Sequence, residues 1–386
     1  MRYYDYMAPS VNFMGPGCIE VLGDRVKLLG VKKPLLVTDT FLNELEDGPV
    51  MQAAASLKNT GIEYAVYTGV EPNPKVRNCL DGLKIYKEEG CDSIITVGGG
   101  SSHDCGKGIG IAATHEKPLT EYAGIETLTN PLPPVIAVNT TAGTASEVTR
   151  HCVLTNLDTH LKFVIVSWRN VPLVSINDPL LMLGVPKSLT AATGMDALTH
   201  AVESYVSVDA NPVTDAAAVQ AIKLVAGNLR QAAANGQNEK ARENMAYASL
   251  LAGMAFNNAN LGYVHAMAHQ LGGQYDMPHG VANAILLPTV EEYNLNSAPE
   301  RFADLAVLLG ENTDGLSVME AAQKSIKAMR DLAADVGIPK TLKEMGVKRE
   351  DFELMAENAL LDGNAFSNPR KGSKEDIISL FEKAYE

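Results

Sequence analysis

The sequence of 386 residues is poor in cysteine and in basic residues, and it contains no long apolar run. Its five cysteines are odd in number and show no close pairing pattern, which favours reduced, buried thiols in a cytosolic protein. No apolar run approaches the roughly 20 residues of a membrane span, and the N-terminus lacks a signal-peptide pattern. We therefore expect a cytoplasmic protein without a membrane partner.

The small number of basic residues also limits the possible partners. Lysine and arginine together number 32 against 46 acidic residues, which gives a net charge of −14. A field of this sign repels nucleic acids and anionic membranes, so neither is an expected partner. A phosphate-bearing ligand would have to be held by local backbone amides. The composition is that of a globular protein with room for two domains.

The first half of the chain alternates between strand and helix patterns. Short apolar segments predict strands at residues 31–39, 64–67, 92–97 and 134–138. Helical patterns lie between them at residues 51–60 and 76–89. This alternation is typical of βαβ units, so we predict an α/β domain with a mostly parallel sheet over residues 1–187.

The second half of the chain has a different pattern. Apolar residues recur at helical spacing, with few strand candidates, in the segments 215–229, 239–257, 317–336 and 374–385. Pro179 and Pro186 interrupt regular structure where the pattern changes. We therefore predict an all-helical domain over residues 188–386.

Histidines are concentrated in one stretch of this helical half. His265 and His269 are four residues apart, so in a helix they lie on one face. Gly272-Gly273 offers a helix stop, and Pro278 brings His279 back from a turn or a new helix start. Neutral imidazole is a ligand that suits Zn, Fe, Ni or Cu. The stretch is therefore a candidate metal-binding segment.

A second pair lies upstream, where Asp196 and His200 are four residues apart in an alanine-rich, helix-favouring run. A core histidine or a surface aspartate would explain any one of these residues, but it explains two such pairs less well. A carboxylate with two or three imidazoles predicts a mixed oxygen and nitrogen site for Fe(II) or Zn(II). Spacing leaves open whether His265 with His269, or His265 with His279, completes this site.

The segment Gly98-Gly99-Gly100-Ser101 lies between a predicted strand and a helix expected from Asp104 onward. Glycines here let a backbone approach a ligand closely, and a helix N-terminus presents N–H groups to a phosphate. The segment is not the G-x-G-x-x-G motif, and a simple tight turn is the alternative.

Hydroxyl groups follow the strand at 134–138, in Asn139 to Ser146, at the sheet edge where α/β proteins bind ligands. Asp39 also follows a strand, and its carboxylate could bind a ribose diol. The same charge would repel the extra phosphate of NADP, which favours NAD. A helix cap is the alternative role for Asp39.

Taken together, these segments resemble the iron-containing (group III) alcohol dehydrogenases over essentially the whole chain. The resemblance implies a dinucleotide-binding α/β domain followed by a helical metal-binding domain, which is the dehydroquinate synthase-like architecture. It also implies a homo-oligomer, from dimer to decamer, with a small alcohol or aldehyde as substrate. Segments 13–17, 149–156 and 362–372 are most similar to members that act on 1,3-propanediol.

The resemblance also implies roles for individual residues. The expected metal ligands are Asp196, His200, His265 and His279, with Fe(II) as the metal and Zn, Ni or Mn as alternatives. His269 is expected to line the cleft, where it could relay the alcohol proton to solvent. The expected NAD contacts are Asp39, Asn73, Gly99, Gly100, Ser101, Thr140, Thr141, Thr149, Lys162 and Leu181. His151 and Phe256 are expected at the substrate pocket, and His151 replaces the asparagine of lactaldehyde-reducing members.

The expected reaction is reversible, NAD-dependent oxidation of a short primary alcohol, with 1,3-propanediol and 3-hydroxypropionaldehyde as the pair. A divalent cation would lower the pKa of the alcohol, and hydride would pass to the nicotinamide. A methanol or broad-range primary alcohol dehydrogenase is the alternative within the family. A metal-dependent hydrolase or lyase of a phosphorylated substrate is the alternative from a different class.

Overall fold

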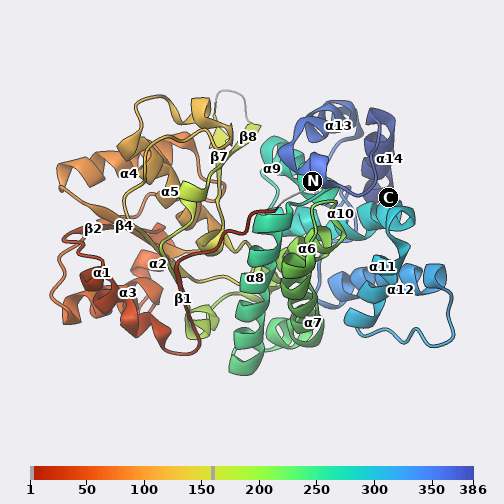
Figure 1. Ribbon diagram of the computed structural model, residues 1–386, viewed down its shortest axis with the longest axis horizontal. Coiled ribbons are helices and arrows are strands. Elements are labelled where there is room, and N and C mark those ends of the chain that lie inside the picture. The colour runs from red at the N-terminus through yellow and green to blue at the C-terminus, as the bar shows by residue number, and fades with distance from the viewer. Residues whose placement is uncertain (1–3, 158–160) are drawn as a thin grey trace. The chain divides into compact units, whose positions relative to one another are not determined.

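The computed structural model describes residues 4–157 and 161–386. The prediction that the N-terminus lacks a signal peptide concerns in part residues 1–3, which lie outside the described residues. The chain divides into two compact units. Unit 1 comprises Met1–Thr141 and Ala145–Gly184, and unit 2 comprises Ala142–Thr144 and Val185–Glu386. In Figure 1, the colour runs from red to yellow-green through unit 1 and from green to blue through unit 2.

A six-stranded parallel sheet forms the centre of unit 1, in the order β1-β9-β6-β4-β2-β3. Its strands in that order are Val11–Met14, Val174–Asn177, Val135–Asn139, Ser93–Gly98, Pro34–Val37 and Ala65–Tyr67. Every residue of β2, β4, β6 and β9 is buried, as expected for a parallel sheet that is covered on both faces. The predicted mostly parallel sheet is confirmed.

Helices cover the sheet of unit 1 on both faces. Leu35 packs into one apolar cluster with Ile109 of α5, whereas the next residue, Leu36, packs into another with Leu57 of α3. Successive strand residues point to opposite faces, which explains this division. The helices of unit 1 are α1 (Leu22–Leu28), α2 (Thr40–Glu44), α3 (Pro49–Asn59), α4 (Val76–Glu88) and α5 (Gly100–Thr114). Its 3₁₀ helices are η1 (Cys18–Val21), η2 (Leu119–Tyr122), η3 (Ser146–Val148), η4 (Trp168–Asn170) and η5 (Pro179–Met182).

A second, three-stranded sheet in unit 1 was not predicted. Strands β7 (His151–Asn156) and β8 (Leu161–Val166) pair antiparallel, and β5 (Gly124–Ile125) lies parallel beside β8. Strands β1 and β9 of the main sheet were also not predicted. Strands β1, β7, β8 and β9 contain polar residues, such as Asn12 and Ser175, that weaken the apolar pattern of a strand, and β5 is only two residues long.

Unit 2 consists of helices, and the structure contains no strand in its residues 142–144 and 185–386. Alanines such as Ala201, Ala221 and Ala252 are fully buried where α6, α7 and α8 pack together, and their small side chains let the helices approach closely. The helices are α6 (Lys187–Val206), α7 (Pro212–Ala234), α8 (Glu239–Ala259), α9 (Tyr263–Tyr275), α10 (His279–Asn294), α11 (Pro299–Leu308), α12 (Val318–Asp335), α13 (Phe352–Leu361) and α14 (Lys374–Tyr385). The 3₁₀ helices are η6 (Leu295–Ser297), η7 (Arg349–Asp351) and η8 (Gly363–Ser367). The all-helical prediction is confirmed for this unit.

Two helix ends differ from the sequence-based expectation. Helix α9 continues through Gly272-Gly273 and ends at Tyr275, and the C-cap residue Asp276 adopts the left-handed conformation with φ 49°. Helix α5 begins at Gly100 instead of at Asp104. In both places glycine was read as a break, although packing of the surrounding helix can hold a glycine in helical conformation.

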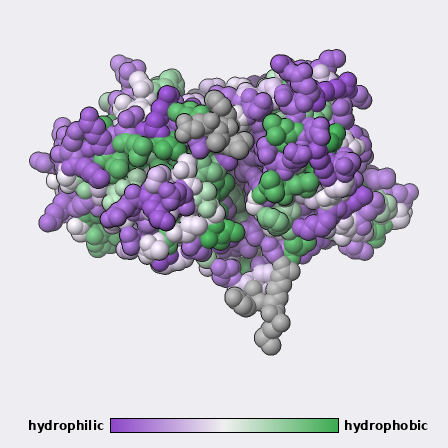
Figure 2. Space-filling view, turned by 90° about the horizontal axis from the view of Figure 1, so that it is seen from above, coloured by the Kyte–Doolittle hydropathy of each residue, from purple (hydrophilic) through white to green (hydrophobic). Residues whose placement is uncertain are grey.

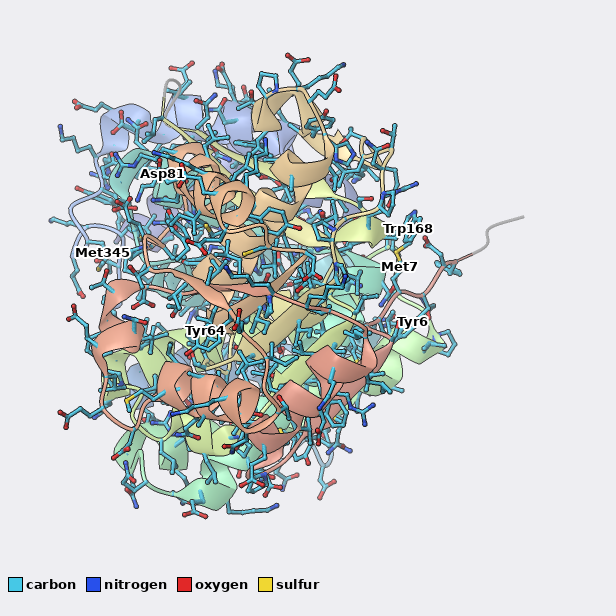
Figure 3. The ribbon with its side chains drawn as sticks, turned by 90° about the vertical axis from the view of Figure 1, so that its left-hand side faces the viewer. Tyr6, Met7, Tyr64, Asp81, Trp168 and Met345 are labelled. Atoms are coloured by element: carbon cyan, nitrogen blue, oxygen red, sulfur yellow. The ribbon has the colours of Figure 1, made fainter. Side chains whose placement is uncertain are left out.

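Hydrophilic residues dominate the face of the molecule in Figure 2, and apolar residues form separate areas among them. The exposed aromatic side chains of Tyr6 and Trp168 belong to unit 1 and lie at its surface in Figure 3. Singly exposed apolar residues are ordinary on a protein surface. No helix in the described part of the chain is long and apolar enough to cross a membrane.

Candidate metal centre

Helix α6 carries two carboxylates and one imidazole on one face. Asp196, His200 and Glu203 follow at spacings of four and three residues, which places them along one stripe of the helix. All three are almost completely buried, at 2%, 4% and 2% exposure. Buried charged and polar groups need partners, so the stripe must face other polar groups.

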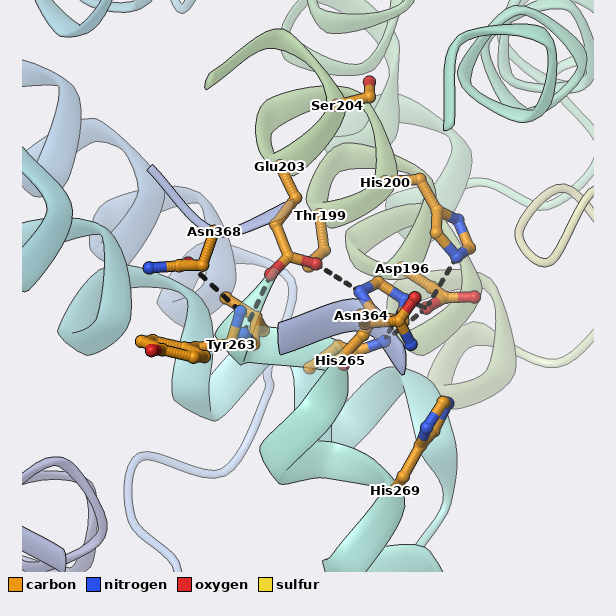
Figure 4. Close-up of polar contacts among 12 residues, drawn as sticks. Asp196, Thr199, His200, Glu203, Ser204, Tyr263, His265, His269, Asn364 and Asn368 are labelled. Carbon is orange, nitrogen blue, oxygen red and sulfur yellow. Dashed lines mark hydrogen bonds and ion pairs between the residues drawn. The ribbon is translucent and has the colours of Figure 1, made fainter. Parts of the chain in front are cut away.

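Helices α9 and α10 supply those groups. His265 lies in the first turn of α9, and His279 is the first residue of α10, directly after Pro278. The nitrogen Nε2 of each ring points to the same carboxylate, at 3.9 Å (His265) and 3.7 Å (His279) from Asp196 Oδ1. His200 Nε2 lies 3.9 Å from the same oxygen. Figure 4 shows Asp196 and His200 of α6 facing His265 of α9.

These four residues form a compact set of potential ligands. One nitrogen or oxygen atom from each of Asp196, His200, His265 and His279 lies within 4.8 Å of the others. Of the two sets that spacing left open, the structure brings together the one with His279. A carboxylate and three imidazoles suit Fe(II) or Zn(II), which accept mixed oxygen and nitrogen ligands.

The contacts around the set fit a bound cation. The amide nitrogen Nδ2 of Asn283 lies 2.7 Å from Asp196 Oδ1 and 3.1 Å from Nε2 of both His265 and His279. An amide nitrogen has only two hydrogens, yet three potential acceptor atoms converge on it. Convergent acceptors in a buried place are the arrangement that a cation requires. Burial also lowers the pKa of His200, which favours the neutral imidazole that binds metals.

His269 lies beside this set without belonging to it. Its ring is stacked on that of His279, with centroids 5.6 Å apart. Its Nδ1 atom is 2.7 Å from Oδ2 of Asp362, which follows the last residue of α13. This aspartate was missed as a site residue, because a single acid 93 positions away carries no spacing signal. Phe256 of α8 stacks on His200, with centroids 4.2 Å apart, and so covers one face of that ring.

A pair of buried carboxylates lies behind the candidate ligands. Glu203 accepts a hydrogen bond from the backbone N–H of Val264 and contacts Nδ1 of His265. Burial, and then the nearby Glu291 carboxylate, raise the pKa of Glu203, whereas hydrogen bonds from the α9 backbone lower it. Burial raises the pKa of Glu291 to about 7, and only the Asn294 amide opposes this shift. A cation on His265 Nε2 would favour the bridging proton on Nδ1 and negative charge on Glu203.

The glycine segment of unit 1 forms the expected strand-to-helix turn. Gly98 ends β4 with φ 150°, a conformation that side chains rarely adopt, and Gly99 is the N-cap of α5. Gly100 and Ser101 therefore lie in the first turn of α5, where N–H groups lack partners within the helix. The N–H of Thr140 donates to Gly98 O at 3.0 Å. Thr140 and Thr141 follow β6, which is paired with β4, so the structure brings these residues together at one sheet edge.

The other residues expected around NAD lie at several places in unit 1. Asp39 caps α2, because its Oδ1 accepts a hydrogen bond from the N–H of Leu42 at 2.8 Å. This contact matches the alternative assignment of Asp39 as a helix cap. Lys162 Nζ donates to Asn73 Oδ1 at 2.8 Å, so those two side chains are paired. Leu181 is a buried residue of η5 in the apolar core.

Thr149 and His151 are held by a lysine that the sequence analysis did not single out. Lys107 of α5 is completely buried, and its Nζ donates to the carbonyl oxygens of Ser146, Thr149 and His151 at 2.7, 3.0 and 2.7 Å. Burial lowers the pKa of Lys107, and the nearby Asp104 opposes the shift. One side chain thus fixes the backbone from η3, through Thr149, to His151 at the start of β7.

Comparison with known proteins identifies the family. The descriptions "Iron-containing alcohol dehydrogenase" and "Fe-containing alcohol dehydrogenase family, C-terminal" match residues 9–179 and 190–385. The chain therefore belongs to the iron-containing alcohol dehydrogenases, as the resemblance predicted, and it is an oxidoreductase.

Individual members of the family differ in how similar they are to this chain. The chain is 69% identical over 384 residues to 1,3-propanediol dehydrogenase of Citrobacter freundii, covering 100% of this chain and 99% of the relative. It is 42% identical to NAD-dependent methanol dehydrogenase of Bacillus methanolicus, covering 98% and 99%. A crystal structure of 1,3-propanediol oxidoreductase matches with a TM-score of 0.97 and 68% identity, over the full length of both chains.

Proposed function

We propose that this chain is a metal- and NAD-dependent dehydrogenase that interconverts 1,3-propanediol and 3-hydroxypropionaldehyde. The observation that carries the proposal is the compact set of Asp196, His200, His265 and His279, in which the first three residues are buried and His279 is partly buried. It occurs in a chain 69% identical, over its full length, to a 1,3-propanediol dehydrogenase. We propose these four residues as ligands of Fe(II), with Zn(II), Ni(II) or Mn(II) as alternatives.

The residues of the site have separate tasks in this proposal. The bound metal would supply Lewis-acid chemistry, which lowers the pKa of an alcohol. Asp196 neutralises part of the positive charge and, with the three imidazoles, fixes its position. His269, held by Asp362, moves the alcohol proton toward solvent. Phe256, which stacks on His200, is proposed as a residue that contacts the alcohol, and His151 is proposed as another.

For the cofactor, we propose that unit 1 binds NAD. The first turn of α5, with Gly99, Gly100 and Ser101, would hold the pyrophosphate on its N–H groups. Asp39 would bind the adenosine ribose. The remaining proposed contacts are Asn73, Thr140, Thr141, Thr149, Lys162 and Leu181. The word NAD-dependent in the name of the 42% identical methanol dehydrogenase supports this choice of cofactor.

Activity with and without metal tests the proposal directly. Protein reconstituted with Fe(II) should form NADH, followed by its absorbance, when 1,3-propanediol and NAD are supplied. A chelator should stop the reaction, and added Fe(II) should restore it. A higher kcat/KM for methanol or ethanol than for 1,3-propanediol would favour the methanol or broad-range alternative. Absence of NADH from every short alcohol, despite bound metal, would contradict the proposal.

Replacing His269 with alanine tests the proton transfer. We expect kcat to fall about 100-fold, the lower end of the range for general acid–base catalysis, and its pH dependence to change. The measurement is kcat from about pH 6 to pH 10, because the pH dependence of kcat reports the acid and base groups of the enzyme–substrate complex. Gln270→Ala, at the next position of α9, is the matched control. Unchanged turnover of His269→Ala across this range would exclude the relay.

Replacing Asp39 with asparagine tests cofactor selection. Asparagine caps a helix as well as aspartate does, so α2 should remain intact while the charge is lost. Charges about 4 Å apart interact by about 1 kcal/mol in water, so relief from a doubly charged phosphate predicts a gain for NADP of about 30-fold. The measurement is the ratio of kcat/KM for NAD and NADP. A ratio equal to that of the unmodified protein would refute the ribose contact.

Further features remain proposals. We propose a homo-oligomer, from dimer to decamer, in the cytoplasm, and domain limits of 1–187 for NAD binding and 188–386 for metal binding. Sedimentation of the purified protein tests the first of these. The hydrolase or lyase alternative has no support from an oxidoreductase family and is not proposed.

A further inference from the structure

We infer that Glu203 is the positioning residue that holds His265 with its Nε2 atom toward the candidate metal ligands; this inference rests on the proposed metal-dependent function. Glu203 lies on the same stripe of α6 as Asp196 and His200. A single helix therefore provides two proposed ligands and also the carboxylate that contacts a third. Figure 4 shows Glu203 behind the His265 ring, on the side away from Asp196.

The two oxygens of Glu203 contact two different parts of α9. Oε1 accepts a hydrogen bond from the N–H of Val264 at 2.8 Å, and Oε2 contacts Nδ1 of His265. The N–H of Val264 belongs to the first helical turn, where no partner within the helix exists. The neighbouring N–H of Tyr263 donates to Asn368 Oδ1 at 3.1 Å. The carboxylate thus fixes both the start of α9 and the imidazole one residue later.

Gly262, directly before α9, makes room for this carboxylate. A Cβ atom at Gly262 would lie 2.9 Å from Glu203 Oε1 and 2.8 Å from Asn368 Oδ1. Its φ of −145° is ordinary extended backbone, so the requirement for glycine comes from these contacts. Both oxygens are buried in the helical unit and have little room to move aside. The chain at residue 262 is therefore shaped to admit the Glu203 carboxylate.

The consequence for His265 concerns its tautomer and its basicity. A proton on Nδ1, donated to Glu203, leaves the lone pair on Nε2, the atom 3.9 Å from Asp196 Oδ1. A carboxylate behind a metal-binding imidazole fixes the ring orientation and makes the ligand nitrogen more basic. Losing such a partner weakens metal affinity by about 10- to 100-fold.

Three variants of the full-length protein test whether the contact of Glu203 with His265 supports metal binding, or whether any buried carboxylate of this unit has the same effect. Glu203→Gln removes the negative charge and leaves a side chain of the same shape. Gly262→Ala removes no polar group but displaces the Glu203 oxygen. Glu291→Gln is the matched control, because Glu291 is also buried on a helix of this unit but accepts its hydrogen bond from the Asn294 amide. Co(II) is the probe, with affinity from chelator competition and ligand geometry from its absorption spectrum.

We expect Glu203→Gln and Gly262→Ala to bind Co(II) about 10- to 100-fold more weakly than the unmodified protein, with altered spectra. Glu291→Gln should retain the affinity and the spectrum. Equal affinity and spectrum in both Glu203→Gln and Gly262→Ala would overturn the inference, as would an equal loss in Glu203→Gln and Glu291→Gln. An unmodified protein that binds no Co(II) would instead refute the proposed metal site itself. Circular dichroism of each variant separates loss of fold from loss of affinity.

Discussion

Replacing Asp196 with alanine is expected to remove bound metal and activity together. Asp196 is the only acid in the candidate ligand set, and the other three ligands are imidazoles without negative charge when they bind. Metal-ion catalysis contributes several kcal/mol to lowering a barrier, so we expect kcat/KM to fall about 1,000-fold or more. Metal content by elemental analysis and NADH formation are measured on the same sample.

Asp304→Ala is the control for this substitution. Asp304 is an exposed acid of α11 whose Oδ2 accepts a hydrogen bond from Tyr205, so its loss should leave the metal content unchanged. An Asp196→Ala protein that is active and free of metal would refute the ligand assignment. An active protein that keeps one metal per chain would show that Asp196 is dispensable.

Replacing Glu291 with glutamine is expected to flatten the pH dependence of stability. Burial raises the pKa of Glu291 to about 7, above its usual 4.5, and the described residues provide no hydrogen-bond partner for its Oε1. Between these pH values the folded protein binds more protons than the unfolded chain, so stability falls as pH rises. The contribution is fully present below pH 4.5 and is lost through pH 7. A shift of this size corresponds to about 3 kcal/mol.

Urea unfolding at pH values on both sides of this window, with chelator present, measures the effect. The difference in unfolding free energy between Glu291→Gln and the unmodified protein should grow in favour of the variant by about 3 kcal/mol from acid to alkaline pH. Glu292→Gln is the control, because the adjacent Glu292 is exposed and pairs with Arg330 at the surface. Parallel pH profiles for Glu291→Gln and the unmodified protein would contradict the expected shift.

The fold was largely predictable because the apolar residues of its strands and those of its helices recur at different spacings in the sequence. Buried parallel strands such as 92–97 and helices such as 239–257 carry strong apolar signals, and both occur where expected. Strands β1 and β9 and the β7–β8 hairpin carry weaker signals, since polar residues interrupt their apolar runs. Helix α9 runs through Gly272-Gly273 because packing in the helical core outweighs the low helix propensity of glycine.

The candidate site could be predicted only in part. Spacing places Asp196 with His200, and His265 with His269, on the faces of helices, but it does not orient one helix against another. The choice between His269 and His279 therefore depended on the resemblance, and the ligand roles stay predictions. Glu203 could have been predicted as a site residue, because it follows Asp196 by seven residues and this spacing places both on the same helix face. Lys107 and Asp362 had none, because their partners are distant in sequence or are backbone carbonyls.

The central claim is that Asp196, His200, His265 and His279 hold one catalytic cation. Anomalous diffraction at the iron edge, from crystals of the protein reconstituted with Fe(II) and active with 1,3-propanediol, tests it most directly. We predict one peak per chain at bonding distance, about 2.0–2.2 Å, from the oxygen and the three nitrogens. Active crystals with no peak among these four side chains, or with the peak at another site, would contradict the claim.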